Sequence, residues 1–301
     1  MARGPSSPTC HPDSERPCWQ QRGLLGIFPL VAFVLGTVAS ACRAPVGKDL
    51  GGALEVLIMY MQRQNIIDAF GNKLARVGLQ TVLTWLLVAL AASIGTALDS
   101  RSAGGDPYAW PYCLALILTA AFVASWTYCM LFIFAALTAM LDRFCYDLAS
   151  TADMVQAMRD WRVLQAALIR ASCSMEWSFI VMLCVVSCAV PLLCADLVSL
   201  GGRWAAVPSV LPGALIVLTI SRAFFAAASI TEKCARVPAL VNSFDFGPGM
   251  EMSREHLAES IRRSDLGFVV CHLRLTWSMA LKFAYVWAVV ALGIATVSVN
   301  A

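Results

Sequence analysis

The sequence predicts an all-α fold: a polytopic membrane helix bundle with about six transmembrane helices, three long helices extending into the cytoplasm, and a split last helix. Composition is the first observation behind this prediction. Of the 301 residues, 59% are hydrophobic and only 14% are charged, so one globular core could not bury the apolar surface. The second observation is that the apolar runs are continuous and about twice as long as a barrel strand, which excludes a transmembrane β-barrel.

Several apolar stretches are long enough to cross a bilayer core of about 30 Å as helices. They cover residues 24–42, 79–97, 110–141, 177–200, 207–228 and 273–299. Helical spacing of apolar residues continues beyond one end of the third, fourth and fifth stretches, which predicts helices about twice as long as the bilayer requires. We expect a disordered tail at 1–23, a transmembrane helical domain at 24–301, and cytoplasmic helical extensions at about 49–77, 142–176 and 229–266.

The extensions carry predictions of their own. The stretch 49–77 is amphipathic and fits either one long helix or a pair of helices, lying on the inner leaflet or on a protein partner. The long helix that begins near Gly213 is expected to end near Pro238, because proline removes a helix hydrogen bond. Three long helices that project together into water need a hydrophobic partner, and we favour oligomerisation.

Lysine and arginine predict the orientation of the chain. The stretches 43–76, 143–170 and 233–274 hold five, four and six of these residues, whereas the two loops between them hold one each. The positive-inside rule places the three basic stretches in the cytoplasm and the C-terminus outside, in a multi-pass protein that we expect in the plasma membrane.

With six spans and an external C-terminus, the N-terminus would also lie outside. The N-terminal tail disagrees with this position, because Arg3, Arg16 and Arg22 directly precede the first apolar stretch and the positive-inside rule would place them inside. One explanation is that an upstream helix is missing from the chain, and the other is a signal sequence over 1–42 with a cleavage site at Ala39-Ser40-Ala41. Cleavage would reverse every later loop, so an incomplete or atypical N-terminus is the preferred interpretation.

Cysteine and histidine show no pattern of a chemical site. The chain has twelve cysteines and three histidines, but no Cys-x-x-Cys pair and no cluster with metal-ligand spacing. We therefore expect no metal, no cofactor and no enzymatic activity, and no nucleic-acid partner.

Apart from Arg274 at the start of the last stretch, which is counted with the basic residues above, the charged residues inside the apolar stretches are few: Asp196, Arg222 and Lys282. Each is a candidate functional residue, because an ionised group in hydrocarbon costs several kcal/mol unless it is used or paired. The alternative is that each side chain reaches the nearer membrane interface. If the last helix lined a pore, Lys282 would repel cations there.

The chain ends in a polar stretch followed by its last apolar run. Residues 230–274 carry six basic and six acidic residues. Ser253 is expected to cap a short helix with Leu257 and Ile261 on one face. Gly267 then interrupts this helix, and the chain resumes at Phe268 as the final membrane helix.

This order of elements over about residues 45–299 resembles the insect gustatory and odorant receptor superfamily, including gustatory receptor-like proteins outside insects. In that family the short helix and the final span are two parts of the seventh membrane helix. Gly267 and Phe268 resemble the similarly placed glycine and aromatic residue of the family. The family signature of the last helix is Thr-Tyr, five apolar residues and Gln-Phe. Here these positions hold Ala284-Tyr285, the apolar residues 286–290, and Ala291-Leu292, so only Tyr285 is identical.

The resemblance implies a chemoreceptor-like subunit of a tetrameric ligand-gated cation channel, with a small-molecule ligand that the sequence does not identify. The family has seven spans and a cytoplasmic N-terminus, so this chain would lack the first span. The last helix would line the pore, with Val286, Val290, Gly293 and Val297 near one face as a hydrophobic constriction. The alternative for this face is contact with lipid or with the core of the bundle.

Other classes of membrane protein are less consistent with the sequence. A secondary transporter is expected to show internal repeats and paired broken helices, and neither is detectable. A G-protein-coupled receptor requires the opposite orientation. A non-conducting receptor or scaffold remains open as an alternative.

Overall fold

The computed structural model describes residue 58 and residues 67–102, 109–151, 153–199, 207–244, 250–264, 266–271 and 273–299. The predicted tail at 1–23 and the first predicted span at 24–42 therefore lie outside the described residues. The same is true of most of the extension at 49–77, of which residues 67–77 belong to the first described long helix.

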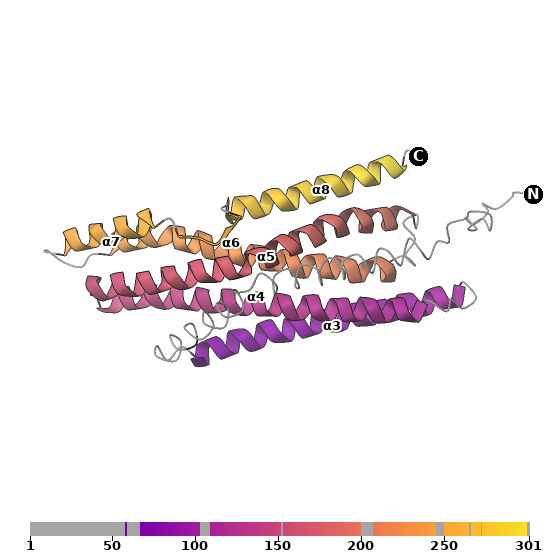
Figure 1. Ribbon diagram of the computed structural model, residues 1–301, viewed down its shortest axis with the longest axis horizontal. Helices are drawn as coiled ribbons and strands as arrows, with labels where there is room; N and C mark the ends of the chain where they lie inside the picture. The colour runs from indigo at the N-terminus through magenta and orange to yellow at the C-terminus, as the bar shows by residue number, and fades with distance from the viewer. Residues whose placement is uncertain are drawn as a thin grey trace, which may run out of the picture.

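Four long helices run side by side along the longest axis of the molecule (Figure 1). They are α3 (Ile67–Ser102), α4 (Ala109–Thr151), α5 (Met154–Ser199) and α6 (Val207–Ser243). The rest of the described chain is the short helix α7 (Glu251–Arg263), the strands β1 (Val269–Val270) and β2 (Leu273–Arg274), and the final helix α8 (Trp277–Val299). The predicted all-α membrane bundle is confirmed.

The long helices have the lengths that the sequence predicted. With 43, 46 and 37 residues, α4, α5 and α6 extend about 55–70 Å at 1.5 Å per residue, roughly twice the thickness of a bilayer core. In the part of the chain that the structure describes, four helices are long and apolar enough to cross a membrane, and α8 contributes a shorter apolar segment, Trp277–Gly293.

Several predicted boundaries were wrong because packing outweighed local signals. The stretch before residue 77 and the span at 79–97 form one continuous helix, α3. Helix α6 continues through Pro238 to Ser243, because Val237 and Val241 on either side of the proline are buried in the core. Their burial offsets the hydrogen bond that the proline removes.

The start of α7 and the start of the last helix also differ from the prediction. Helix α7 begins at Glu251, so Ser253 lies inside it and does not cap it. The last helix begins at Trp277, and residues 269–274 form a β-hairpin instead. Thr276 is the cap of α8, since its Oγ1 accepts a hydrogen bond from the backbone N–H of Met279 at 3.3 Å.

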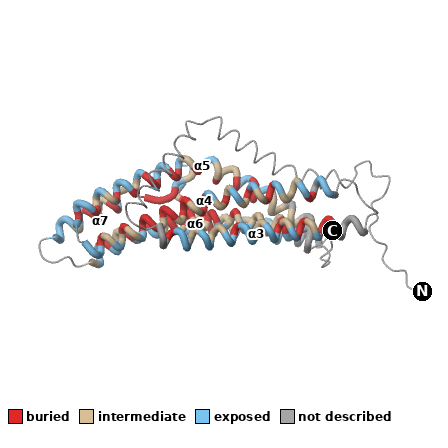
Figure 2. Tube along the Cα trace, turned by 90° about the horizontal axis from the view of Figure 1, so that it is seen from below, coloured by how far each residue is buried: buried red, intermediate tan, exposed pale blue. Residues whose placement is uncertain are grey.

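The buried residues lie where the long helices face one another, and the outward faces are exposed along most of the bundle (Figure 2). Many of the exposed side chains are large and apolar, including Leu79, Leu83, Leu118 and Leu218. A helix that is apolar on all sides requires lipid or protein around it. The structure therefore has the surface of a membrane protein.

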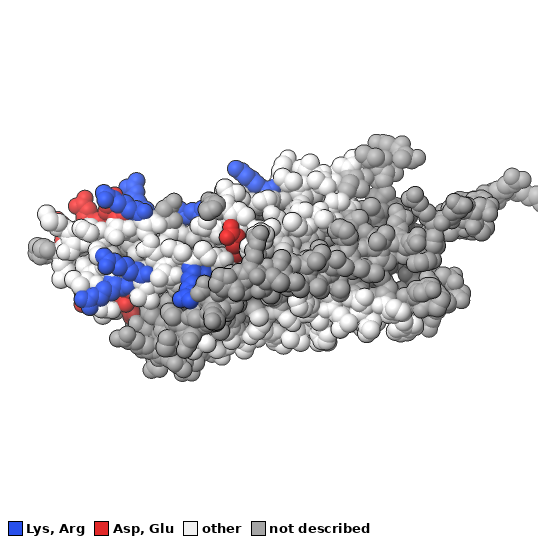
Figure 3. Space-filling view, viewed as in Figure 1, with Lys and Arg blue, Asp and Glu red and all other residues white. Residues whose placement is uncertain are grey.

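Charged side chains are concentrated at one end of the bundle. In the view of Figure 3, Lys, Arg, Asp and Glu lie mainly over the half that contains α7, and the described atoms of the other half are uncharged. Interhelical and intrahelical ion pairs stabilise the charged half: Lys233 with Asp142 at 2.7 Å, and Arg143 with Asp147 at 3.0 Å. The predicted cytoplasmic end corresponds to this half, although its sidedness stays a prediction.

Candidate functional site

The connection between α7 and α8 is anchored by Phe268, the aromatic residue that the sequence singled out. Its side chain is fully buried, with 0% of its surface exposed. Its ring lies 5.3 Å from the ring of Phe134 in α4 and 5.1 Å from that of Phe179 in α5, between centroids. These are favourable distances for aromatic pairs. Phe268 therefore fixes the start of the last segment in the centre of the bundle.

Backbone hydrogen bonds to side chains hold the hairpin against two long helices. The N–H of Phe268 donates to Oγ1 of Thr231 in α6 at 2.9 Å. The N–H of Val269 donates to Oγ of Ser172 in α5 at 3.3 Å, and one turn further along α5 the carboxylate of Glu176 accepts from the N–H of Cys271 at 2.7 Å. The edge of this short strand is therefore satisfied by side chains in place of a third strand.

The hairpin turn is tight and has two residues. Val270 pairs with Leu273 in antiparallel register, and Cys271 has a φ of 51°, as two-residue hairpin turns with positive φ require. Local desolvation, and secondly the neighbouring Glu176, raise the pKa of the Cys271 thiol above its ordinary value.

Gly267 lies directly before this anchor, and it is required there for space. A Cβ atom at this position would lie 2.5 Å from Nε of Arg274 and 2.9 Å from Cγ2 of Thr231. Arg274 is held in place because its guanidinium donates to the carbonyl of Leu266. The predicted pair of Gly267 and Phe268 is thus a close backbone contact followed by a buried aromatic anchor.

Among the described helices, α8 packs on the bundle through one face. It contacts α5 and α6, and the ring of Trp277 lies 5.1 Å from that of Phe225 in α6. Within α8, the rings of Phe283 and Trp287 lie 6.3 Å apart. Ala280 is buried on this face. Ala291, eleven positions later and thus on the same face, is half-buried. Ala291 was predicted as a motif residue of the last helix, and it faces the bundle.

The predicted pore residues lie on the uncovered side of α8. Val286 and Val290 are 53% and 38% exposed, and Gly293 is exposed; the side chain of Val297 lies outside the described residues. Lys282 is also exposed and precedes Val286 by four positions, so it belongs to the same sector of the helix.

Two other motif residues lie on a different sector of α8. Tyr285 and Leu292, seven positions apart, are 70% and 65% exposed and are turned about 100° away from the valine sector at 100° per residue. The uncovered surface of α8 therefore has a valine sector with a lysine at one end, and a second sector with larger side chains.

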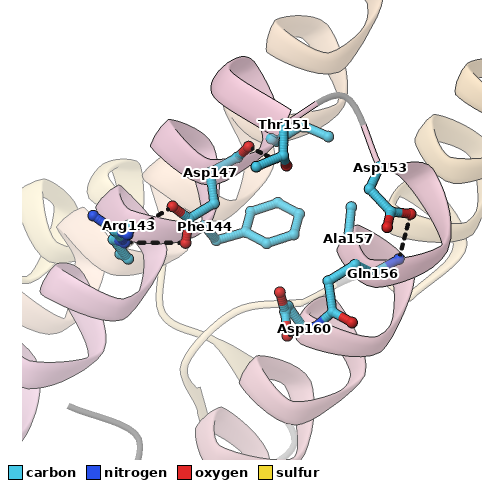
Figure 4. Close-up of a pocket in the computed structure, with 9 residues that line it drawn as sticks. Arg143, Phe144, Asp147, Thr151, Asp153, Gln156, Ala157 and Asp160 are labelled. Carbon is cyan, nitrogen blue, oxygen red and sulfur yellow. Dashed lines mark hydrogen bonds and ion pairs between the residues drawn. The ribbon is translucent and has the colours of Figure 1, made fainter. Parts of the chain in front are cut away.

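Sequence reasoning did not find the cavity at the turn between α4 and α5 (Figure 4). It has a volume of about 230 Å³. Its three acidic side chains are occupied. Asp147 pairs with Arg143, Asp153 caps α5 by accepting from the N–H groups of Val155 and Gln156 at 3.0 Å, and Asp160 accepts from Nε2 of Gln156 at 2.9 Å. In the part of the chain that the structure describes, no group of His, Cys, Asp and Glu could hold a metal ion.

The three charged residues that the sequence predicted inside the spans lie in different surroundings. Arg222 in α6 donates from Nη2 to Oε1 of Gln80 in α3, and both residues are exposed. Lys282 lies on the uncovered side of α8, as described above. The side chain of Asp196 lies outside the described residues.

Comparison with solved structures identifies the architecture. The chain superposes on the insect olfactory receptor OR5 from Machilis hrabei with a TM-score of 0.62, over 94% of this chain and 83% of that chain, at 10% sequence identity. The chain has the fold of an insect olfactory receptor. No family model matches the sequence, and no curated protein sequence matches it.

The olfactory-receptor fold agrees with the resemblance that the sequence indicated, from the long helices to the divided last segment. Together with its four membrane-length helices, it makes the chain a multi-pass membrane protein. At 10% identity the likeness establishes the fold, and the role of the uncovered face of α8 must be argued from its own residues.

Proposed function

We propose that the chain is a chemoreceptor-like subunit of a ligand-gated cation channel, in which α8 lines the pore of a homotetramer. One observation carries the proposal: α8 is an apolar helix anchored at its start, and it leaves the sector of Lys282, Val286, Val290 and Gly293 uncovered. The olfactory-receptor fold supports the choice of function.

The physical argument begins with the packing of α8. All but one of its described side chains are uncharged and most are apolar over its 23 residues, yet only one face contacts the other helices that the structure describes. A symmetric ring of subunits would place one uncovered sector toward the axis and the other toward a neighbouring subunit or lipid. The valine sector suits the axis, because its small side chains and Gly293 permit close approach and form a hydrophobic constriction that excludes water until it widens.

The hairpin before α8 suits a gate that moves as a unit. Phe268 and its neighbours are fixed to α5 and α6 through the contacts described above, whereas α8 beyond Trp277 has a single packed face. We infer that ligand binding shifts the helices on which the hairpin rests, and that α8 rotates or tilts about its anchored start.

The proposed assembly places the charged end of the bundle in the cytoplasm of a plasma-membrane protein, with the C-terminus outside. Exposed apolar side chains at that end, including Tyr146, Val155 and Ile169, offer surface for contacts between subunits. Epitope tags at each terminus of the full chain test the orientation: antibody access to the C-terminal tag on intact cells is expected, and an internal C-terminus would contradict it.

The pore assignment is tested with Val290→Cys in cells that express the full chain, using a panel of small molecules to find an activating ligand. A positively charged thiol reagent is expected to block the current of this variant. Wild type, measured with and without the reagent, serves as the control for the native cysteines. Leu118→Cys on the exposed face of α4 is the matched lipid-facing control. Equal block of both variants would contradict a pore at α8.

A further inference from the structure

The surface where α3 meets α6 carries a polar group in an apolar surrounding. Arg222 donates from its guanidinium to the side-chain carbonyl of Gln80, and this bond joins two helices whose positions lie 142 apart in the sequence. Both side chains are exposed. The exposed neighbours on the two helices include large apolar side chains: Leu79, Leu83 and Leu218.

The depth of this group follows from α8. Trp277, the first residue of α8, contacts Phe225 of α6, and the 23 residues of α8 extend about 34 Å, close to the thickness of the hydrocarbon core. The boundary of the core therefore lies near Phe225. Arg222 is three residues, or about 4.5 Å, on the apolar side of that boundary, which is where lipid headgroups meet acyl chains.

A second arginine lies one helical turn before Gln80 on α3. Arg76 is exposed and precedes Gln80 by four positions, so the two residues are neighbours on one face of α3. In the part of the chain that the structure describes, the ion pairs join other residues and leave Arg76 and Arg222 without a carboxylate. Residues 77–97 of α3 contain no charged side chain, so Arg76 is the last charge before the apolar part of the helix.

Two guanidinium groups at a lipid boundary match one class of ligand. Guanidinium forks bind phosphate oxygens with paired, charge-assisted hydrogen bonds. The Gln80 amide uses its carbonyl to accept from Arg222, which leaves its NH₂ group available as a further donor. An exposed arginine at this depth is stabilised by an anion that can itself reside at the boundary.

We propose that Arg222, Arg76 and Gln80 form a binding site for the headgroup phosphate of an anionic phospholipid in the leaflet at the charged end of the bundle. The acyl chains of this lipid lie along the exposed leucines of α3 and α6. The bound lipid connects α3 to α6 and stabilises the outer helix of the bundle. This inference does not depend on whether the chain conducts ions.

The test uses the full chain purified in nanodiscs of phosphatidylcholine with or without phosphatidylglycerol. Native mass spectrometry measures the retained phosphatidylglycerol, and thermal unfolding measures its stabilising effect. Wild type is expected to retain phosphatidylglycerol over phosphatidylcholine. Arg222→Gln and Arg76→Gln should each weaken retention about fivefold, and the double variant about 25-fold, as about 1 kcal/mol per basic residue predicts.

The matched control is Arg236→Gln, which removes the same charge from α6 at a position that pairs with Glu232 at 3.7 Å and should leave retention unchanged. Equal retention in wild type and the double variant would overturn the proposal. Inorganic phosphate is also added to the chain in phosphatidylcholine nanodiscs. If it stabilises the chain as much as phosphatidylglycerol does, the site binds a soluble anion, and the proposal of a lipid site is overturned. Arg222 joins α6 to α3 through Gln80, so if Arg222→Gln does not fold, Arg76→Gln alone decides.

Discussion

Substituting Gly267 by alanine tests whether the start of the last segment is held by close contact with α6 and β2. No unusual backbone angle requires glycine at this position, so the prediction concerns space alone. The new Cβ would lie 2.5 Å from Nε of Arg274 and 2.9 Å from Cγ2 of Thr231. Both distances are well inside ordinary contact between heavy atoms.

The magnitude follows from how little the neighbours can move. Thr231 is buried and accepts the hydrogen bond of the Phe268 N–H, and Arg274 is held by its bond to the Leu266 carbonyl. An extra methyl group in such a site costs about 1–3 kcal/mol. For a chain of this size, that lowers the midpoint of thermal unfolding by about 2–10 °C.

The assay is thermal unfolding of the purified full chain in detergent, followed by the loss of the monodisperse size-exclusion peak. Gly71→Ala is the matched control, because a Cβ at Gly71 in α3 meets nothing within 4 Å; it should be neutral or stabilise by up to about 1 kcal/mol. Equal midpoints for the two variants would show that the region around Gly267 adapts freely, and would refute the reasoning.

Two further predictions concern the anchor and the conduit. Phe268→Ala should cost about 3–5 kcal/mol in the same unfolding assay, because it empties the centre of an aromatic cluster; Val269→Ala at the half-exposed neighbour should cost far less, and similar losses would disprove the anchor. In the proposed channel, Lys282→Gln should raise the permeability of Ca²⁺ relative to Na⁺ by about threefold or more, because a ring of lysines repels divalent ions twice as strongly as monovalent ions. Reversal potentials measure this permeability ratio. Lys233→Gln is the control, since Lys233 pairs with Asp142. An unchanged ratio in Lys282→Gln would place Lys282 away from the ion path.

Much of the fold could be predicted from the sequence, because local hydrophobic composition and the helical spacing of apolar residues indicate membrane helices. The excess length of α4, α5 and α6 was predicted from spacing that continues past the apolar runs. The shared face of Leu257 and Ile261 in α7 was also predicted, and both residues are buried. Helix ends were predicted less well. Burial of Val237 and Val241 outweighed the local signal of Pro238, and α7 begins two residues before Ser253.

The candidate site was predicted only in part. The importance of Gly267 and Phe268, and the common sector of Val286, Val290 and Gly293, follow from order and helical period. The β-hairpin between them was not predicted, because its two-residue strands are too short to show an alternating pattern.

The sequence by itself predicted a helical membrane protein, the unusual length of α4, α5 and α6, and which residues of the last helix share a side. Hydropathy and helical period are properties of neighbouring residues, so they need no knowledge of distant contacts. Only the tertiary structure decided that Phe268 is the buried anchor, that Ser172 and Glu176 hold the hairpin, and that Arg222 meets Gln80. These contacts join positions 37 to 142 apart, and only the packing of whole helices brings such positions together.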